Sequence, residues 1–75
     1  MHEFQRILGE RVKEERRKRR LTQKQLADFV HSNKRTILDI EMGRGNPKLE
    51  TLFSILNYLE IDPYTIFFNR AFILF

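Results

Sequence analysis

The chain has 75 residues, of which 14 are Lys or Arg and 10 are Asp or Glu, and it contains no cysteine. This length allows one domain with one small core and excludes a fold built around a deep active-site cavity, while the lack of cysteine excludes disulfides and thiolate metal sites. Residues 1–48 hold 13 basic and 7 acidic residues, a net charge of +6, whereas residues 49–75 hold 1 and 3, a net charge of −2. Such a split suits a domain that meets a polyanion with one face.

The sequence contains no pattern typical of a membrane span, a signal peptide, a metal site or a catalytic site. Its longest apolar run, residues 71–75, is far shorter than the roughly 20 residues that span a bilayer, and the N-terminus has no apolar stretch of the signal-peptide kind. His2 and His31 lack the spacing of metal ligands, and no nucleophile stands with an oriented base. We therefore expect a cytoplasmic binding protein that is not an enzyme and holds no cofactor or metal.

The first predicted helix runs from about residue 3 to 19. Its apolar stripe repeats at helical spacing, in Phe4, Ile7, Leu8 and Val12, and continues into Arg16 and Arg19. Residues 11–20 hold seven basic and two acidic residues. Positive charge toward a helix C-terminus complements the helix dipole, so this run alone indicates no more than a solvated helix end.

Two short helices joined by a tight turn are predicted next. Thr22 is a suitable N-cap for the first of them, whose buried stripe is Leu26, Ala27 and Val30. Asn33 caps the second, about residues 33–42, which ends at Gly43 in the left-handed C′ position. Ile37 and Ile40 face inward, and the outward side chains are Lys34, Arg35, Leu38 and Asp39. A short helix held behind another, with a basic outer face, is the geometry that inserts side chains into the major groove of DNA.

The remaining chain predicts two further helices. Residues 43–47 form a loop without a nucleotide-binding pattern. A fourth helix is indicated by Leu49, Leu52, Phe53, Leu56 and Leu59. Asp62 and Pro63 open a fifth, from Tyr64 to about Asn69, with Ile66 and Phe67 inward. The tail, residues 70–75, fits a helix or a strand equally well. We predict one all-α domain of five helices over residues 1–75, with its core in 4–68 and a short apolar segment in 69–75.

Many positions between Leu8 and Phe67 share the register of one known family. They are Leu8-Gly9, Val12, Arg16, Leu21-Thr22-Gln23, Leu26-Ala27, Thr36-Ile37, Ile40-Glu41, Gly43, Asn46-Pro47, Leu49-Glu50-Thr51-Leu52 and Leu59. In these residues the chain resembles the helix-turn-helix domains of the Cro and phage-repressor type, also called the XRE family. The resemblance implies a compact, lambda-repressor-like bundle of about five helices that binds operator DNA, usually as a symmetric dimer.

The resemblance also implies roles for individual residues. The groove-facing side of the recognition helix would comprise Asn33, Lys34, Arg35, Leu38 and Asp39. Gln23 would lie against the DNA backbone at the start of the preceding helix, and the loop of residues 43–46 would approach phosphates with help from Arg44. Arg16 and Glu41 match the ion pair that joins the first helix to the recognition helix.

Side-chain chemistry gives these residues specific tasks. Arg35 can donate to both O6 and N7 of guanine, whereas Lys34 suits either guanine or a phosphate. Leu38 fits a thymine methyl group. Asp39 can orient Arg35 through an i,i+4 pair or accept from cytosine N4, and that intrahelical pair is also the simplest structural explanation of both residues. The candidate phosphate ligands are Gln23, Thr22, Lys24, Arg44, Asn46, Arg16, Arg19, Arg20 and Lys48.

Three residues depart from the family pattern. His31 stands where the turn glycine is usual, so it has to adopt a left-handed conformation. Ser32 replaces an apolar residue of the turn, and Glu15 takes a position that is commonly apolar in the first helix. None lies on the groove-facing side, so we expect them to affect stability more than binding.

The C-terminal residues supply a reason for pairing. Their aromatic and aliphatic side chains exceed what a small core can absorb, which predicts a dimer interface of Tyr64, Phe68, Phe72, Ile73, Leu74 and Phe75. In the alternative, Phe72 and Phe75 cover the chain's own helices. The function predicted is a homodimeric transcriptional regulator that reads a palindromic operator in double-stranded DNA. The alternatives are an antitoxin with a toxin partner, a restriction-modification controller, a protein-interaction adaptor and, least favoured, a helix lying on anionic lipid.

Overall fold

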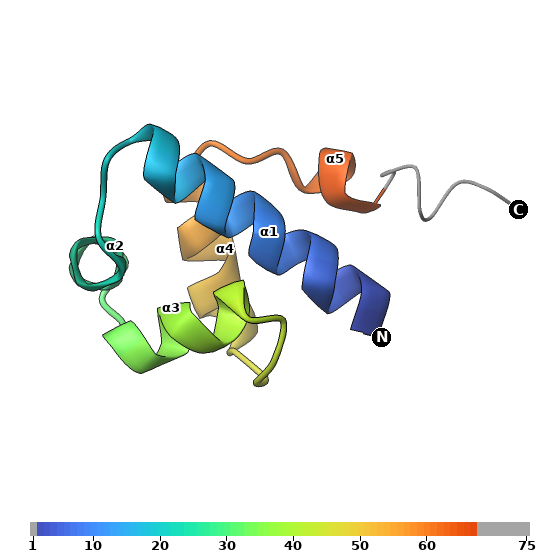
Figure 1. Cartoon of the computed structure of the whole chain (residues 1–75), viewed down its shortest axis with the longest axis horizontal. Coiled ribbons are helices and arrows are strands. Elements are labelled where there is room, and N and C mark those ends of the chain that lie inside the picture. Colours follow the sequence, from blue (N-terminus) through green and yellow to red (C-terminus); the bar gives the residue numbers. More distant parts are fainter. Residues whose placement is uncertain (1, 68–75) are drawn as a thin grey trace, which may run out of the picture.

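A computed structural model describes residues 2–67 of the chain. In this range it contains five helices and no strand: α1 (His2–Lys18), α2 (Gln23–Phe29), α3 (Lys34–Glu41), α4 (Leu49–Tyr58) and α5 (Pro63–Phe67). Helices α2 and α3 adjoin each other beside α1, and α5 packs against α1 (Figure 1). The all-helical prediction is confirmed. Three predictions lie outside the described residues and side chains. They are the end of the fifth helix, the inward position of Phe67 and the structure of the tail.

Four helices end in the same way. At each end the chain turns through one residue with a positive φ angle, and the next amide donates to a carbonyl five residues earlier, as in Ser32 to Ala27 at 2.8 Å and Ile61 to Leu56 at 2.8 Å. This is the Schellman motif, in which glycine is the usual left-handed residue. Only α3 uses glycine there, and the other three helices use Arg20, His31 and Glu60.

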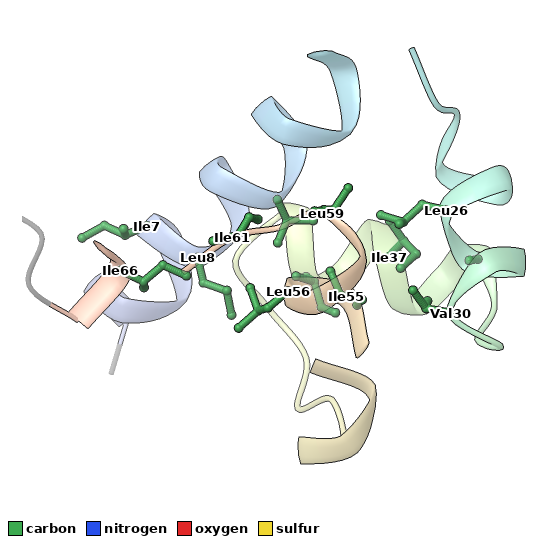
Figure 2. Packing of buried hydrophobic residues seen from close by; sticks show 13 residues of the cluster. Ile7, Leu8, Leu26, Val30, Ile37, Ile55, Leu56, Leu59, Ile61 and Ile66 are labelled. Atoms are coloured by element: carbon green, nitrogen blue, oxygen red, sulfur yellow. The ribbon is translucent and has the colours of Figure 1, made fainter. Parts of the chain in front are cut away.

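A single apolar core joins the helices (Figure 2). It runs from Ile7 and Ile66, through the central leucines, to Leu26 and Ile37 at the other end (Figure 2). Its buried residues are Ile7, Leu8, Val12, Leu26, Ala27, Val30, Ile37, Ile40, Ile55, Leu56, Leu59, Ile61 and Ile66. Every residue expected to face inward in α2 and α3 is in this set, so the two helices of the predicted turn are oriented as expected.

Two of the apolar residues that indicated the fourth helix lie at the surface of α4. Leu49 and Phe53 are 64% and 54% exposed, whereas Ile55 is fully buried. The stripe that meets the core is Leu52, Ile55, Leu56 and Leu59, at the i, i+3, i+4, i+7 spacing of one helix face. Leu49 and Phe53 lie a turn apart beside that stripe, which places them at the surface.

Two side-chain contacts join further pairs of helices, α2 with α4 and α1 with α5. The rings of Phe29 in α2 and Tyr58 in α4 stack with their centroids 4.9 Å apart and an interplanar angle of 17°. On the other side, Arg11 Nη1 donates to Thr65 Oγ1 at 3.1 Å and so joins α1 to α5. Among the described residues, none of the helices has the length and apolarity to cross a bilayer, and no cluster of three potential metal ligands occurs.

Candidate nucleic-acid interface

The start of α2 is held by a capping box. Thr22 Oγ1 accepts from the Gln25 amide at 3.0 Å, and the Thr22 amide donates to Gln25 Oε1 at 2.8 Å. Two amides that a helix N-terminus would otherwise leave unpaired are thus satisfied. The cap predicted at Thr22 is confirmed, and it places Gln23 at the first position of the helix.

The turn between α2 and α3 has the strained residue that the sequence predicted. His31 has a φ angle of +56°, in the left-handed region. Asn33 then caps α3, since its Oδ1 accepts from the Thr36 amide at 2.9 Å and from Thr36 Oγ1 at 3.2 Å. The side-chain oxygen of Asn33 is therefore engaged in holding α3, and its amide nitrogen is the part that remains for other contacts.

Helix α3 has two distinct faces. Ile37 and Ile40 are buried against the core, while Lys34 and Arg35 at its first turn are exposed. Leu38 and Asp39 are half-buried beside them. The cationic residues thus lie exposed in the first turn of α3, and the structure brings together the side chains predicted to read bases.

One carboxylate joins α3 to both preceding helices. Arg16 of α1 donates from Nε to Glu41 Oε2 at 2.6 Å and from Nη2 to Glu41 Oε1 at 3.0 Å. Gln23 of α2 donates from Nε2 to the same Oε1 at 3.1 Å. The ion pair expected between Arg16 and Glu41 is present, and Gln23 extends it into a three-helix network. Sequence reasoning missed the Gln23 contact, because nothing in the local pattern distinguishes a surface glutamine from a bonded one.

Arg16 is buried and is held by hydrogen bonds within the domain. The residue is 8% exposed, and its Nη1 donates to the Leu21 carbonyl at 2.7 Å. All three guanidinium nitrogens therefore have partners inside the domain. These bonds give Arg16 a structural role in joining α1 to α3, and its phosphate contact stays a prediction.

Asp39 is the centre of a second charged cluster. It lies 3.3 Å from Arg35 Nε and 3.1 Å from Arg44 Nε, so it is shared by α3 and the loop that follows. The hydrogen bond from Arg44 and the nearby Arg35 charge lower the pKa of the Asp39 carboxyl. The i,i+4 pair of Arg35 and Asp39 was expected, whereas the approach of Arg44 was not, because it depends on how the loop turns.

Comparison with known proteins decides the family. A family model described as helix-turn-helix matches residues 12–66. The chain belongs to that family. It is a helix-turn-helix domain of the Cro and phage-repressor type, a family of DNA-binding domains and not of enzymes.

One curated protein extends the comparison. The immunity repressor protein of Bacillus phage phi105 is 41% identical over 59 residues, which cover 79% of this chain and 41% of the repressor. The chain thus spans less than half the length of that relative. No solved structure matches it.

The helix-turn-helix domain keeps several basic and polar side chains around α2 and α3. Lys24 pairs with Asp28 across one turn of α2 at 3.4 Å, and Arg19 pairs with Glu15 at 3.0 Å. Both pairs are partly exposed and therefore weak enough to exchange for a phosphate. Two further basic candidates, Arg20 and Lys48, are exposed and form no ion pair among the described residues, and the neutral candidate Asn46 is also exposed.

Glu15 is a carboxylate where the family commonly has an apolar residue, and neighbouring cations balance its charge. Its carboxylate, which is 17% exposed, lies 3.0 Å from Arg19, 3.3 Å from Lys18 and 3.9 Å from Arg11. The hydrogen bond from Arg19, followed by those contacts, lowers the pKa of Glu15 despite its partial burial. A position that is commonly apolar is thus filled by a carboxylate among three cations.

The predicted dimer interface is represented by one residue in the described range. Tyr64 is 67% exposed at the second position of α5. Phe68 and the residues of 72–75 lie outside that range. Exposed Leu49 and Phe53 add apolar surface on α4, and Phe53 lines a shallow hollow of about 500 Å³ with Ser54, Leu56, Asn57, Ile61 and Pro63.

Proposed function

We propose that this domain binds double-stranded DNA sequence-specifically, with α3 in the major groove, and acts as a homodimeric transcriptional regulator. The observation that carries the proposal is the division of α3 into a buried face, Ile37 and Ile40, and an exposed N-terminal turn with Lys34 and Arg35. A recognition helix enters the groove with its N-terminal residues toward the base edges. The similarity to a phage immunity repressor supports a role in transcription.

In this arrangement Arg35 is the principal base-reading residue. Its exposed guanidinium can donate two parallel bonds to guanine, which are worth about 1–3 kcal/mol of discrimination. Lys34 reads guanine or holds a phosphate, Leu38 contacts a thymine methyl group, and Asn33 contributes its amide nitrogen. Asp39 accepts from cytosine N4 or orients Arg35.

The flanking segments hold the DNA backbone. The N-terminus of α2 presents Thr22, Gln23 and Lys24, and the loop after α3 presents Arg44, Asn46 and Lys48. Arg19 and Arg20 extend the basic surface at the end of α1. Each phosphate contact contributes about 0.9 to the slope of log affinity against log salt concentration. We expect four to six phosphate contacts per subunit, so the affinity for DNA should fall steeply as the salt concentration rises.

A homodimer would place two recognition helices about 34 Å apart, one turn of DNA, and would read a palindromic operator. Tyr64 supports this part of the proposal as an exposed aromatic residue on α5, and Phe68, Phe72, Ile73, Leu74 and Phe75 belong to the same proposed interface. Light scattering of the whole chain and of a chain ending at Asn69 tests it. Loss of the dimer in the shorter chain is expected, and an unchanged mass would remove the tail from the interface.

Selection of bound fragments from random duplex DNA tests the main proposal. The parent is expected to enrich one palindromic sequence, and the double variant Lys34→Ala/Arg35→Ala is expected to lose it. A matched control, Lys13→Ala/Arg17→Ala, removes two cations from the outward side of α1, where they line a hollow that includes no residue of α3. Equal binding by both double variants would contradict a reading role for α3.

The alternatives predict other outcomes of the same experiments. An antitoxin or a restriction-modification controller of this fold would also enrich an operator, and an antitoxin would in addition bind a toxin. An adaptor would retain its partner through the apolar C-terminal surface, and neither double variant would affect its binding. Failure of the parent to shift any duplex DNA would favour the adaptor.

A further inference from the structure

The outer face of α3 presents a carboxylate where a cationic surface is expected. Helix α3 has two acidic residues, and Glu41 is buried in the network with Arg16. Asp39 is therefore the carboxylate that α3 presents outward, with its side chain 26% exposed. A negative charge beside two base-reading cations opposes the approach of phosphates. Its presence calls for a physical explanation.

Asp39 organises the loop as well as the helix. The Arg44 amide donates to the Asp39 carbonyl at 2.9 Å, and Arg44 Nε donates to Asp39 Oδ1 at 3.1 Å. Gly45 packs so closely on the same residue that a Cβ atom there would lie 3.1 Å from Asp39 Cβ. Beside these contacts, a hollow of about 200 Å³ is lined by residues of both α3 and the loop: Thr36, Asp39, Ile40, Gly45, Asn46 and Pro47. The Asp39 side chain is thus one of the groups that hold the loop, together with Gln5 of α1, whose Nε2 donates to the Gly45 carbonyl at 3.5 Å.

The contacts of Asp39 leave both arginines able to bind DNA. They involve the Nε atom of each guanidinium, from Arg35 and from Arg44. The side chains of these arginines remain 74% and 53% exposed. An arginine held through Nε keeps its two terminal nitrogens for guanine O6 and N7 or for a phosphate. One carboxylate therefore sets the orientation of a base-reading and a backbone-binding side chain together.

We propose that Asp39 is the specificity-determining residue of this interface: it positions Arg35 for guanine and Arg44 for phosphate, and its charge weakens binding to DNA that offers neither in register. The inference rests on the proposed DNA binding and deepens it. On a matching site the two arginines reach their acceptors while Asp39 keeps them aligned. On other DNA the carboxylate faces phosphate or base acceptors without compensation. Selectivity gained by penalising wrong partners is an established physical route to specificity.

The test compares two variants that each remove one negative charge. Asp39→Asn retains shape and an acceptor oxygen, and Glu14→Gln is its matched control. Glu14 pairs with an arginine of its own, Arg11 at 3.9 Å, and is exposed on the outward side of α1. Affinities are measured by fluorescence anisotropy for the operator selected with the parent and for a scrambled duplex of equal composition. Melting temperatures establish that each variant is folded.

Asp39→Asn is expected to bind scrambled DNA about five-fold more tightly, the factor for one unit charge about 4 Å from a phosphate in water. Its ratio of operator to scrambled affinity falls by at least that factor, and its preference for guanine weakens in a repeated selection. Glu14→Gln keeps the parental ratio, and Asp39→Glu, which keeps the charge, retains weak binding to scrambled DNA. An equal ratio in Asp39→Asn and Glu14→Gln would overturn the inference. A parent that does not distinguish operator from scrambled DNA would overturn the proposed function itself, and this inference with it.

Discussion

Gly9 of α1 lies directly against the carbonyl oxygen of Ile40 in α3. A Cβ atom at position 9 would be 2.3 Å from that oxygen and 3.0 Å from the carbonyl oxygen of Glu41. Both neighbours are backbone atoms at the end of the recognition helix, so they cannot turn aside as a side chain would. The absence of a side chain at Gly9 therefore allows α1 to approach the last turn of α3.

Whether Gly9→Ala raises or lowers the free energy of unfolding tests this contact. In an ordinary helix interior Ala is about 1 kcal/mol more favourable than Gly, whereas overpacking costs about 1–3 kcal/mol. Because the overpacking cost outweighs the gain in helix propensity, we expect the free energy of unfolding to fall by up to about 2 kcal/mol in urea denaturation. Glu14→Ala, at an exposed position of the same helix, is the control and should change it little. A more stable Gly9→Ala protein would contradict the close approach.

The Arg16–Glu41 pair predicts a large loss when one partner is removed. The Glu41 side chain is 2% exposed, so Glu41→Ala leaves the Arg16 guanidinium without its counter-charge in a nearly dry site. Such single losses cost about 3–5 kcal/mol. We expect thermal unfolding to show a loss of that size, with DNA affinity falling in parallel as α3 loses its connection to α1 and α2.

A double-mutant cycle separates the pair from its surroundings. Arg16→Met combined with Glu41→Leu removes both charges and should be less destabilising than the sum of the two single changes. Additive effects would mean that the two side chains do not depend on each other.

The left-handed turn at His31 predicts a stabilising substitution. A non-glycine residue with a positive φ costs about 1–2 kcal/mol, and glycine avoids this cost but loses more entropy on folding. His31→Gly should therefore raise the free energy of unfolding by up to about 1 kcal/mol. His31→Val, which is branched at Cβ, should lower it. A destabilised glycine variant in calorimetry would show that His31 makes contacts that outweigh its strain.

Acid should destabilise the domain in part through Glu15. Its pKa is lowered in the folded protein, first by the hydrogen bond from Arg19. A carboxyl of this kind contributes stability that is complete above its usual pKa of 4.5 and is lost as pH falls through the lower folded value. The melting temperature should decline as pH falls below about 4.5, and less steeply in Glu15→Gln. The melting temperature of Glu15→Gln should still decline somewhat, because the pKa values of Asp39 and Glu3 are also lowered.

Features governed by neighbouring residues could be predicted from the sequence. Thr22 and Asn33 each cap the helix that follows within three residues, so their roles follow from residue type and position. The inward faces of α2 and α3 follow from apolar spacing. Arg20 and Glu60 take left-handed conformations that the sequence does not signal, because the usual sign of this turn is glycine.

Contacts between distant segments were less predictable. In α4 the choice between Phe53 and Ile55 as the buried residue depends on which side of the helix meets the core, and both fit a helical stripe. Arg16 and Glu41 were paired through the family resemblance and not from their spacing. The hydrogen bond from Gln23 to Glu41 and the approach of Arg44 to Asp39 depend on the folded backbone, so neither had a local signal.

The three-helix network of Arg16, Gln23 and Glu41 affects how the DNA sequence preference of such a domain can change in evolution. Because Glu41 bonds both Arg16 and Gln23, the exposed or half-buried residues 34, 35 and 38 can change without disturbing the network that sets the angle of α3. New operator preferences can then arise by exchange of a few outer side chains on an unchanged frame. Descendants of one ancestral chain could in this way recognise separate sites while retaining the same architecture.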